Sequence, residues 1–251
     1  MEEVQLEEVR EGGDQVDLEE ITIQKDAWRE AYEKLMNKSI ITFYALLTSK
    51  SWKLIESPSS SVLLFESNKN ASQGFYTLKT QTVLKVRPER LMYVIRDHDP
   101  DTRLAWDSEY IKECQELDCF QTKDGEIKVV STLIETGIPM LSPRFQMGIA
   151  WYGYDPKTES YKYVFRSTQH KMHKCPDDAV NVVSLIGVLV KTLRCEEKRI
   201  SELFIVAHIN PGNNFPSAIA HGFCKEWLRD RVALYNKVAG EGWSKYYEKK
   251  K

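Results

Sequence analysis

Apolar side chains recur at helical spacing between residues 21 and 48. Ala27, Ala31 and Leu35 lie four residues apart, and the apolar pattern continues to the end of this stretch. The spacing predicts one amphipathic helix. Polar residues at 37–39 leave open a break in the middle of the helix.

Shorter runs that alternate between apolar and polar residues follow, and turn residues separate them, as in strands joined by hairpins. The runs predicted to form strands are residues 52–56, 62–66, 75–86, 110–117, 126–135, 144–152, 161–168, 182–193 and 201–209. The turn at residues 195–198 favours a hairpin between the last two runs. Because strands and helices do not alternate regularly, we expect one strongly curved antiparallel sheet.

Two further segments have helical periodicity. Pro88 opens the first, which is followed by a helical turn over residues 101–107. The second begins after Pro216 and ends at Gly240. Its apolar stripe is Ile219, Phe223, Trp227, Leu234 and Val238. A long amphipathic helix must cover an apolar surface, so we expect it to close the open face of the sheet and leave a space for a ligand between them.

The chain is therefore predicted to form a single α+β domain over residues 21–243. Residues 1–20 are strongly acidic and indicate a disordered tail, and residues 244–251 indicate a short basic tail. No internal repeat or low-complexity linker divides the domain.

The composition, with 42% hydrophobic and 29% charged residues, is that of a globular protein. A net charge of −2 provides no field for nucleic acid, so we expect no nucleic-acid partner. With no apolar run of about 18 residues and an acidic N-terminus, we expect a cytoplasmic protein. We also expect it to be a monomer. The five cysteines lack CxxC spacing, which indicates neither a disulfide framework nor a metal site, and no cofactor is expected.

Arg103 and Asp107 lie four residues apart on the predicted helical turn, next to Trp106. This spacing places a guanidinium and a carboxylate on one face, where they can pair with each other or hold a zwitterion. A structural ion pair and a ligand site both remain open. Trp151 belongs to a cluster of strand aromatics that either packs across hairpins or surrounds a cation.

Motifs of nucleotide-binding loops, nucleophile elbows and zinc proteases do not occur, so we expect no enzymatic activity and no catalytic residue. A cavity enzyme would need an inward acid or base, for which Glu135, His170 and His208 are the nearest candidates. His170 and His173 fall at a predicted strand end, where this spacing does not bring side chains together on a metal.

Several segments in this order resemble the START domain, the lipid-transfer family related to the steroidogenic acute regulatory protein. They are TRLAWD (residues 102–107), PMLSPRF (139–145), RSTQH (166–170) and INPGNNFP (209–216). The resemblance extends from Trp28 to Val238. It implies a helix-grip fold, in which a curved sheet wraps around a C-terminal helix and encloses an apolar tunnel for one lipid.

The resemblance also implies roles for individual residues. Arg103 and Asp107 match positions that contact a phosphocholine head group in some members. Residues 137–142 match the loop that gates the tunnel together with the last helix; the gate residues expected here are Gly137, Met140, Leu141, Phe215 and Ile219. A charged pair that sterol-binding members place in the tunnel falls on Ser131 and Ala150.

The expected function is lipid binding and transfer with transient membrane contact, with a phospholipid slightly favoured over a sterol. The alternatives are an aromatase/cyclase or hydrolase in the same cavity, or a protein-interaction module in which the acidic tail recruits a partner.

Overall fold

The computed structural model describes residues 18–59, 62–67, 74–170, 173–212, 215 and 217–248. Within them the chain forms five helices and ten strands. The helices are α1 (Leu18–Leu47), α2 (Pro88–Ile95), α3 (Pro100–Asp107), α4 (Ser217–Ala239) and α5 (Trp243–Tyr246). The strands are β1 (Lys53–Ser59), β2 (Val62–Ser67), β3 (Tyr76–Leu84), β4 (Ile111–Thr122), β5 (Gly125–Ile134), β6 (Arg144–Asp155), β7 (Ser160–Ser167), β8 (Val180–Asn181), β9 (Val183–Cys195) and β10 (Lys198–Asn210).

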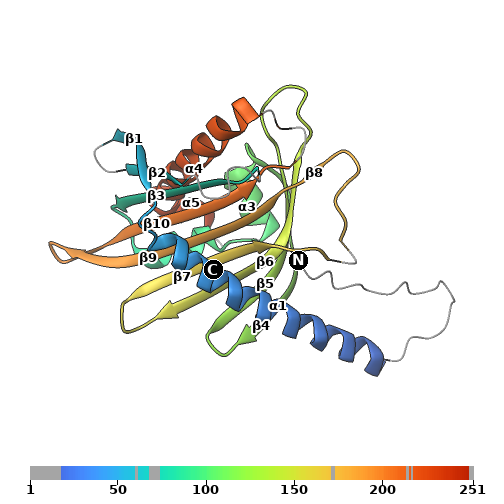
Figure 1. Cartoon of the computed structure of the whole chain (residues 1–251). Helices are drawn as coiled ribbons and strands as arrows, with labels where there is room; N and C mark the ends of the chain where they lie inside the picture. The colour runs from blue at the N-terminus through green and yellow to red at the C-terminus, as the bar shows by residue number, and fades with distance from the viewer. Residues whose placement is uncertain are drawn as a thin grey trace.

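All the strands belong to one sheet with the order β1-β2-β3-β10-β9-β7-β6-β5-β4 (Figure 1). Neighbours along this path are antiparallel, and β9 and β10 form the hairpin predicted from the turn at residues 195–198. Pairing of β3 with β10 joins the first strands of the chain to the last. The predicted antiparallel sheet is confirmed, and the two-residue β8, which runs parallel to β6, is an addition to it.

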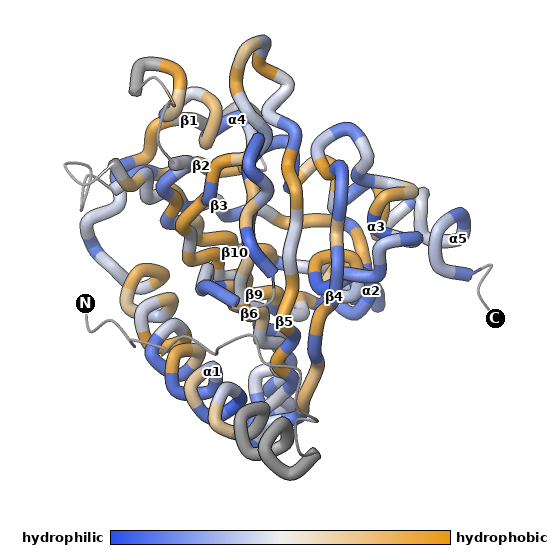
Figure 2. Tube along the Cα trace, turned by 90° about the vertical axis from the view of Figure 1, so that its right-hand side faces the viewer, coloured by the Kyte–Doolittle hydropathy of each residue, from blue (hydrophilic) through white to orange (hydrophobic). Residues whose placement is uncertain are grey.

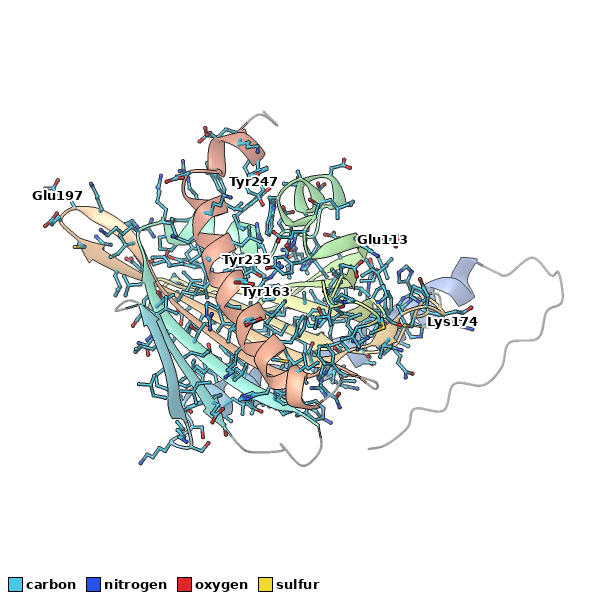
Figure 3. All side chains as sticks on the ribbon, turned by 90° about the horizontal axis from the view of Figure 1, so that it is seen from above. Glu113, Tyr163, Lys174, Glu197, Tyr235 and Tyr247 are labelled. Atoms are coloured by element: carbon cyan, nitrogen blue, oxygen red, sulfur yellow. The ribbon has the colours of Figure 1, made fainter. Side chains whose placement is uncertain are left out.

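Helices cover both faces of the sheet (Figures 1 and 3). α1 contacts β6, β7, β9 and β10 on one face, which we call the outer face, whereas α2 and α4 lie on the other, which we call the inner face. Successive side chains of a strand point to opposite faces, so Val129 packs in the outer core and Val130 in the inner core. This arrangement confirms the predicted α+β helix-grip fold.

The outer core is closely packed around Phe43 of α1, which is 1% exposed. A Cβ atom on Gly187 of β9 would lie only 2.0 Å from the Phe43 ring. Only glycine at this position therefore lets the helix approach the sheet so closely.

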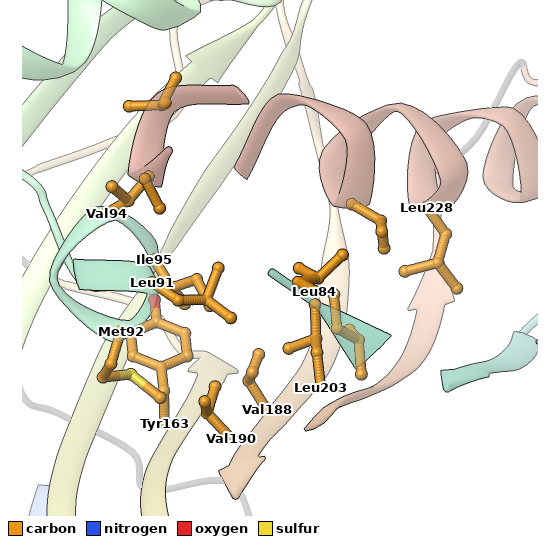
Figure 4. Close-up of a cluster of buried hydrophobic side chains, with 14 of the residues drawn as sticks. Leu84, Leu91, Met92, Val94, Ile95, Tyr163, Val188, Val190, Leu203 and Leu228 are labelled. Atoms are coloured by element: carbon orange, nitrogen blue, oxygen red, sulfur yellow. The ribbon is translucent and has the colours of Figure 1, made fainter. Parts of the chain in front are cut away.

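The inner core joins both helices to the sheet (Figure 4). Leu228 of α4 and Leu91 of α2 pack with Val188 and Leu203 of the central strands, and all four are almost fully buried. The edge strand β4 is mostly hydrophilic (Figure 2), and its charged side chains discourage pairing with another sheet.

The structure also decides one open question and moves the limits of both predicted tails. α1 is unbroken, because Ser39 donates its hydroxyl to the Leu35 carbonyl oxygen at 2.8 Å and so needs no partner outside the helix. The expected acidic tail ends within α1, which begins at Leu18, and residues 1–17 lie outside the described residues. The expected basic tail includes most of α5 and also Tyr247, whose hydroxyl donates to Asp97 Oδ2 at 2.8 Å.

Candidate functional site

A cavity of about 80 Å³ lies between the inner face of the sheet and α4. Its walls are mostly apolar and include Ile95, Val188 and Leu228. Tyr163 from β7 and Tyr235 from α4 add hydroxyl groups to the same walls (Figure 3). The space therefore has the mixed character of a binding site, with apolar walls and a few polar groups.

A second cavity, of about 40 Å³, lies toward the start of α4. Both cavities are lined by Ile134, Gln146, Ile186 and Trp227, so the two lie next to each other along the helix, and we call them together the path under α4. Both are far smaller than the ~300–1,000 Å³ of typical small-molecule sites. A lipid can therefore enter only if α4 or the neighbouring loop moves away from the sheet.

Larger depressions lie on the surface of the protein. One of about 670 Å³ on the outer face is lined in part by Thr168, Gln169 and His173, and another of about 760 Å³ beside the β9–β10 turn is lined mainly by charged residues. Both are open to solvent, and an apolar ligand in them would remain partly hydrated. The path under α4 is therefore the candidate site.

Three buried charged side chains meet beside the cavity of about 80 Å³, which is the larger of the two cavities under α4. Arg103 Nε donates to Asp107 Oδ2 at 3.0 Å, and Arg103 Nη2 lies 2.8 Å from the same oxygen. Arg231 of α4 donates to that oxygen from Nη1 at 2.5 Å. The side chains of Arg103, Asp107 and Arg231 are 9%, 0% and 4% exposed. Two guanidiniums thus share one carboxylate, which leaves a formal charge of +1.

Arg103 has partners for all three of its nitrogens. Besides its contacts with Asp107, Nη1 donates to the Asp97 carbonyl oxygen at 3.2 Å, and the guanidinium carbon lies 4.3 Å from the centre of the Trp106 ring. Burial lowers the pKa of Arg103, but Tyr235 and Asp107 raise that pKa further, and the net change is upward. The structure brings together Arg103, Trp106 and Asp107, and their contact with a ligand remains a prediction.

Arg231 is a site residue that the sequence analysis missed. It lies on the buried stripe of α4 with Ala220, Cys224 and Leu228, and it lines the larger cavity. The guanidinium carbon lies 4.5 Å from the centre of the Tyr110 ring. The sequence could have indicated this residue, because Arg231 is a charged residue three positions after Leu228, on the apolar side of an amphipathic helix.

Arg144 is a third buried arginine, 3% exposed, and it lines the smaller cavity. Its Nη1 donates to the Ser142 carbonyl oxygen at 2.8 Å, and its guanidinium carbon lies 5.0 Å from the centre of the Phe215 ring. Burial lowers the pKa of Arg144. Ser142, at the end of the predicted gate loop, and Phe215, two residues before α4, therefore both contact this side chain.

The other predicted gate residues lie at or near the surface. Gly137 and Met140 have left-handed φ angles of +66° and +67°, and Met140 is fully exposed. Leu141 is half-buried, and Ile219 is 45% exposed on the first turn of α4. Phe215 packs against the ring of Phe223, with 5.1 Å between ring centres. Whether these residues gate the path remains a prediction.

The predicted tunnel residues of the sheet lie on different faces. Ala150 packs in the inner core but does not line either cavity, whereas Trp151 packs under α1 on the outer face. Ser131 also points to the outer face, where its Oγ lies 2.9 Å from His173 Nε2. The cavity is lined instead by Thr132, because a shift of one residue along a strand moves a side chain to the other face.

His98 and Tyr163 form a buried hydrogen bond in the cavity wall, with 3.2 Å between Nε2 and the hydroxyl oxygen. Burial, helped by two nearby positive charges, lowers the pKa of His98 to about 3, and burial raises the pKa of Tyr163. Both groups are therefore uncharged at neutral pH. The acid and base candidates Glu135, His170 and His208 do not line either cavity.

The described residues contain no helix that is long and apolar enough to cross a membrane. Within the same residues, no three His, Cys, Asp or Glu side chains are grouped as metal ligands.

No protein-family model and no curated protein matches this chain. Solved structures of START proteins are similar to it in fold. Human STARD10 has a TM-score of 0.68 at 17% identity, covering 84% of this chain and 82% of that one. Human StAR-related lipid transfer protein 5 has a TM-score of 0.73 at 12% identity, covering 85% and 98%. The human StarD13 lipid transfer and protein localization domain has a TM-score of 0.58 at 13% identity, covering 79% and 92%. The START-like fold predicted from the sequence is confirmed.

Proposed function

We propose that this protein binds one lipid between the inner face of its sheet and α4 and transfers it between membranes. The main support is the path of two neighbouring cavities, which is apolar over most of its walls. Transfer of an acyl chain from water into such a space is favourable by about 25 cal/mol per Å² of apolar surface. Two of the similar solved structures are of proteins named for lipid transfer.

The proposed cargo is a phospholipid rather than a sterol. Buried guanidiniums line both cavities, at Arg103 and Arg231 in one and at Arg144 in the other. A phosphate accepts two charge-assisted hydrogen bonds from a guanidinium, whereas a sterol hydroxyl has a single oxygen. We propose that the protein does this as a cytoplasmic monomer that touches membranes only transiently.

The proposed entrance lies where the loop of residues 137–142 approaches the first turn of α4 (Figure 1). Met140 and Ile219 expose apolar side chains from these two elements, which suits brief contact with a membrane surface. Because the present cavities are small, the loop and α4 must separate during uptake and release.

Native mass spectrometry of protein incubated with mixed vesicles of phosphatidylcholine, phosphatidic acid and cholesterol tests this proposal. We expect one phospholipid per chain. Ile186 lines both cavities, so Ile186→Trp should fill the path and prevent binding. The matched control is Val83→Trp, because Val83 is 43% exposed on β3.

Thermal unfolding of both variants controls for damage to the fold, since overpacking costs about 1–3 kcal/mol. A wild-type protein without lipid, or a folded Ile186→Trp protein that binds as well as wild type, would contradict the proposal.

A further inference from the structure

Among the residues that the structure describes, none pairs with one edge of the Arg231 guanidinium. Nη1 is used for Asp107, whereas Nε and Nη2 are buried and have no hydrogen-bond partner in the described part of the chain. The N–H groups of these two nitrogens point in parallel directions. They match the spacing of two oxygens of a phosphate or carboxylate group.

The charges around Arg231 do not balance. Among the described residues, Asp107 is the only carboxylate in an ion pair with Arg103 or Arg231. Two nearby carboxylates, Asp97 and Asp230, each accept a hydrogen bond from a tyrosine hydroxyl at 2.8 Å. Neither forms an ion pair with the two arginines. Burial raises the pKa of the Asp97 carboxyl group and the charge of Arg103 opposes that rise, but this carboxyl group makes no direct side-chain contact with either guanidinium. A buried positive charge without a carboxylate in direct contact is unfavourable, so the site favours an incoming anion.

A cavity lies beside the unpaired edge of the Arg231 guanidinium. Arg231 lines the larger cavity, and the ring of Tyr110 covers one face of its guanidinium. From this cavity the path continues between apolar side chains to the smaller cavity near the start of α4. An anionic group at Arg231 would thus be followed by room for an apolar chain.

Resting on the lipid-binding function proposed above, we propose that Arg231 binds the oxyanion of a lipid head group that contains no cation. A phosphate monoester and a carboxylate both have this chemistry. The Arg103–Asp107 spacing alone suggested a zwitterion. Both arginines contact Asp107 through Oδ2, and Oδ1 has no hydrogen-bond partner among the described residues. The structure favours an anion because an anionic head group offsets the excess charge of +1, whereas a zwitterionic head group leaves it in place.

The test measures which lipids the full-length protein extracts from phosphatidylcholine vesicles that contain either phosphatidic acid or oleate. Native mass spectrometry gives the ratio of anionic to zwitterionic lipid bound, relative to the vesicle. We expect wild type to enrich at least one anion about tenfold or more, as one charge-assisted bidentate contact allows. The two vesicle types show whether the oxyanion comes from a phosphate head group or from a fatty acid.

Arg231→Met should return the bound ratio to about that of the vesicle. Lys237→Met removes an exposed cation from the same helix and should leave the enrichment unchanged. Arg144→Met removes another buried guanidinium with a free edge, at the smaller cavity, and should lower the enrichment less than Arg231→Met does. Arg231→Lys keeps the charge but not the paired donors, and should retain part of the enrichment.

Wild-type protein that binds phosphatidylcholine as readily as both anions would overturn this inference and leave lipid binding intact, and the edge of Arg231 would then be hydrated in the cavity. Loss of the preference in Arg144→Met but not in Arg231→Met would place the anion at the wrong arginine and overturn it too. Absence of any bound lipid would overturn both proposals. Even if Arg231→Met does not fold, the ratio of anionic to zwitterionic lipid bound by the wild-type protein still tests the preference for an anion.

Discussion

The two faces of the sheet are built in opposite ways. On the outer face, α1 approaches so closely that Gly187 has no room for a Cβ beside Phe43, and the surrounding core is apolar. On the inner face, α4 leaves two cavities and buries Arg231 against the Arg103–Asp107 pair.

Cavities and unbalanced buried charges both lower stability. Because the cavities and the buried charges are all on the inner face, we infer that the outer face mainly stabilises the fold and the inner face mainly binds the lipid. Substitutions on the two faces should therefore have different effects on unfolding and on lipid binding.

The largest loss of stability is expected on the outer face. Phe43→Ala removes a ring that is 1% exposed, and the cavity left behind should cost about 4 kcal/mol of unfolding free energy. Urea unfolding measures this loss. The lipid selectivity of the molecules that remain folded should not change, and a changed selectivity would contradict the division between the faces.

The next largest loss is expected at the buried charges. Asp107→Asn leaves two guanidiniums without a carboxylate and should lower the unfolding free energy by about 3 kcal/mol. This is the low end of the range for breaking a buried ion pair, because the amide oxygen still accepts a hydrogen bond. Arg231→Met leaves one guanidinium paired with one carboxylate and should cost less. Urea unfolding of both variants would refute this explanation if Arg231→Met were the less stable one.

Acid should weaken the inner face through His98. Its pKa is about 3 in the folded protein and about 6.5 when unfolded, so the unfolded chain binds the extra proton between these values. The contribution of His98 to stability is complete above about pH 6.5 and falls by about 1.4 kcal/mol per pH unit below it.

The comparison that isolates this effect is wild type against His98→Gln, measured by urea unfolding from pH 7 to pH 5. Other titrating groups, including Asp97, contribute to both proteins and cancel in the difference. A wild-type pH dependence no steeper than that of the variant would show that His98 can be protonated in the folded state.

The smallest effect on stability is expected at the entrance. Leu141→Asp places a charge on a half-buried loop residue and should change the unfolding free energy by about 0.5 kcal/mol or less. It should nevertheless slow lipid transfer between vesicles severalfold, as followed with a fluorescent phospholipid. Val83→Asp, at an exposed apolar position on β3, is the control, and equal transfer rates for the two variants would argue against a gate at Leu141.

The sequence predicted most of the fold because alternation and helical periodicity depend on neighbours along the chain. Strands β2 to β7, β9 and β10 and helices α2, α3 and α4 lie close to their predicted ranges. The short β8 and α5 were missed because two to four residues have no measurable period, and each is stabilised by contacts with distant segments.

The candidate site was only partly predictable. The spacing of Arg103 and Asp107 indicated their ion pair, but the third partner, Arg231, comes from 124 residues farther along the chain. Ser131 and Trp151 were expected in the tunnel, but the alternation of side chains along their strands places both on the outer face. An error of one position along a strand cannot be detected from the sequence without knowing which strand residues face α4.

Photo-crosslinking with a phospholipid that bears a diazirine in its acyl chain tests the central claim most directly. After irradiation of the complex, peptide mass spectrometry identifies the modified residues. Lipid bound under α4 should label inner-face residues such as Ile186, Val188 and Trp227, which line the cavities. Labelling confined to the outer-face depression around His173 and Cys175 would contradict the account.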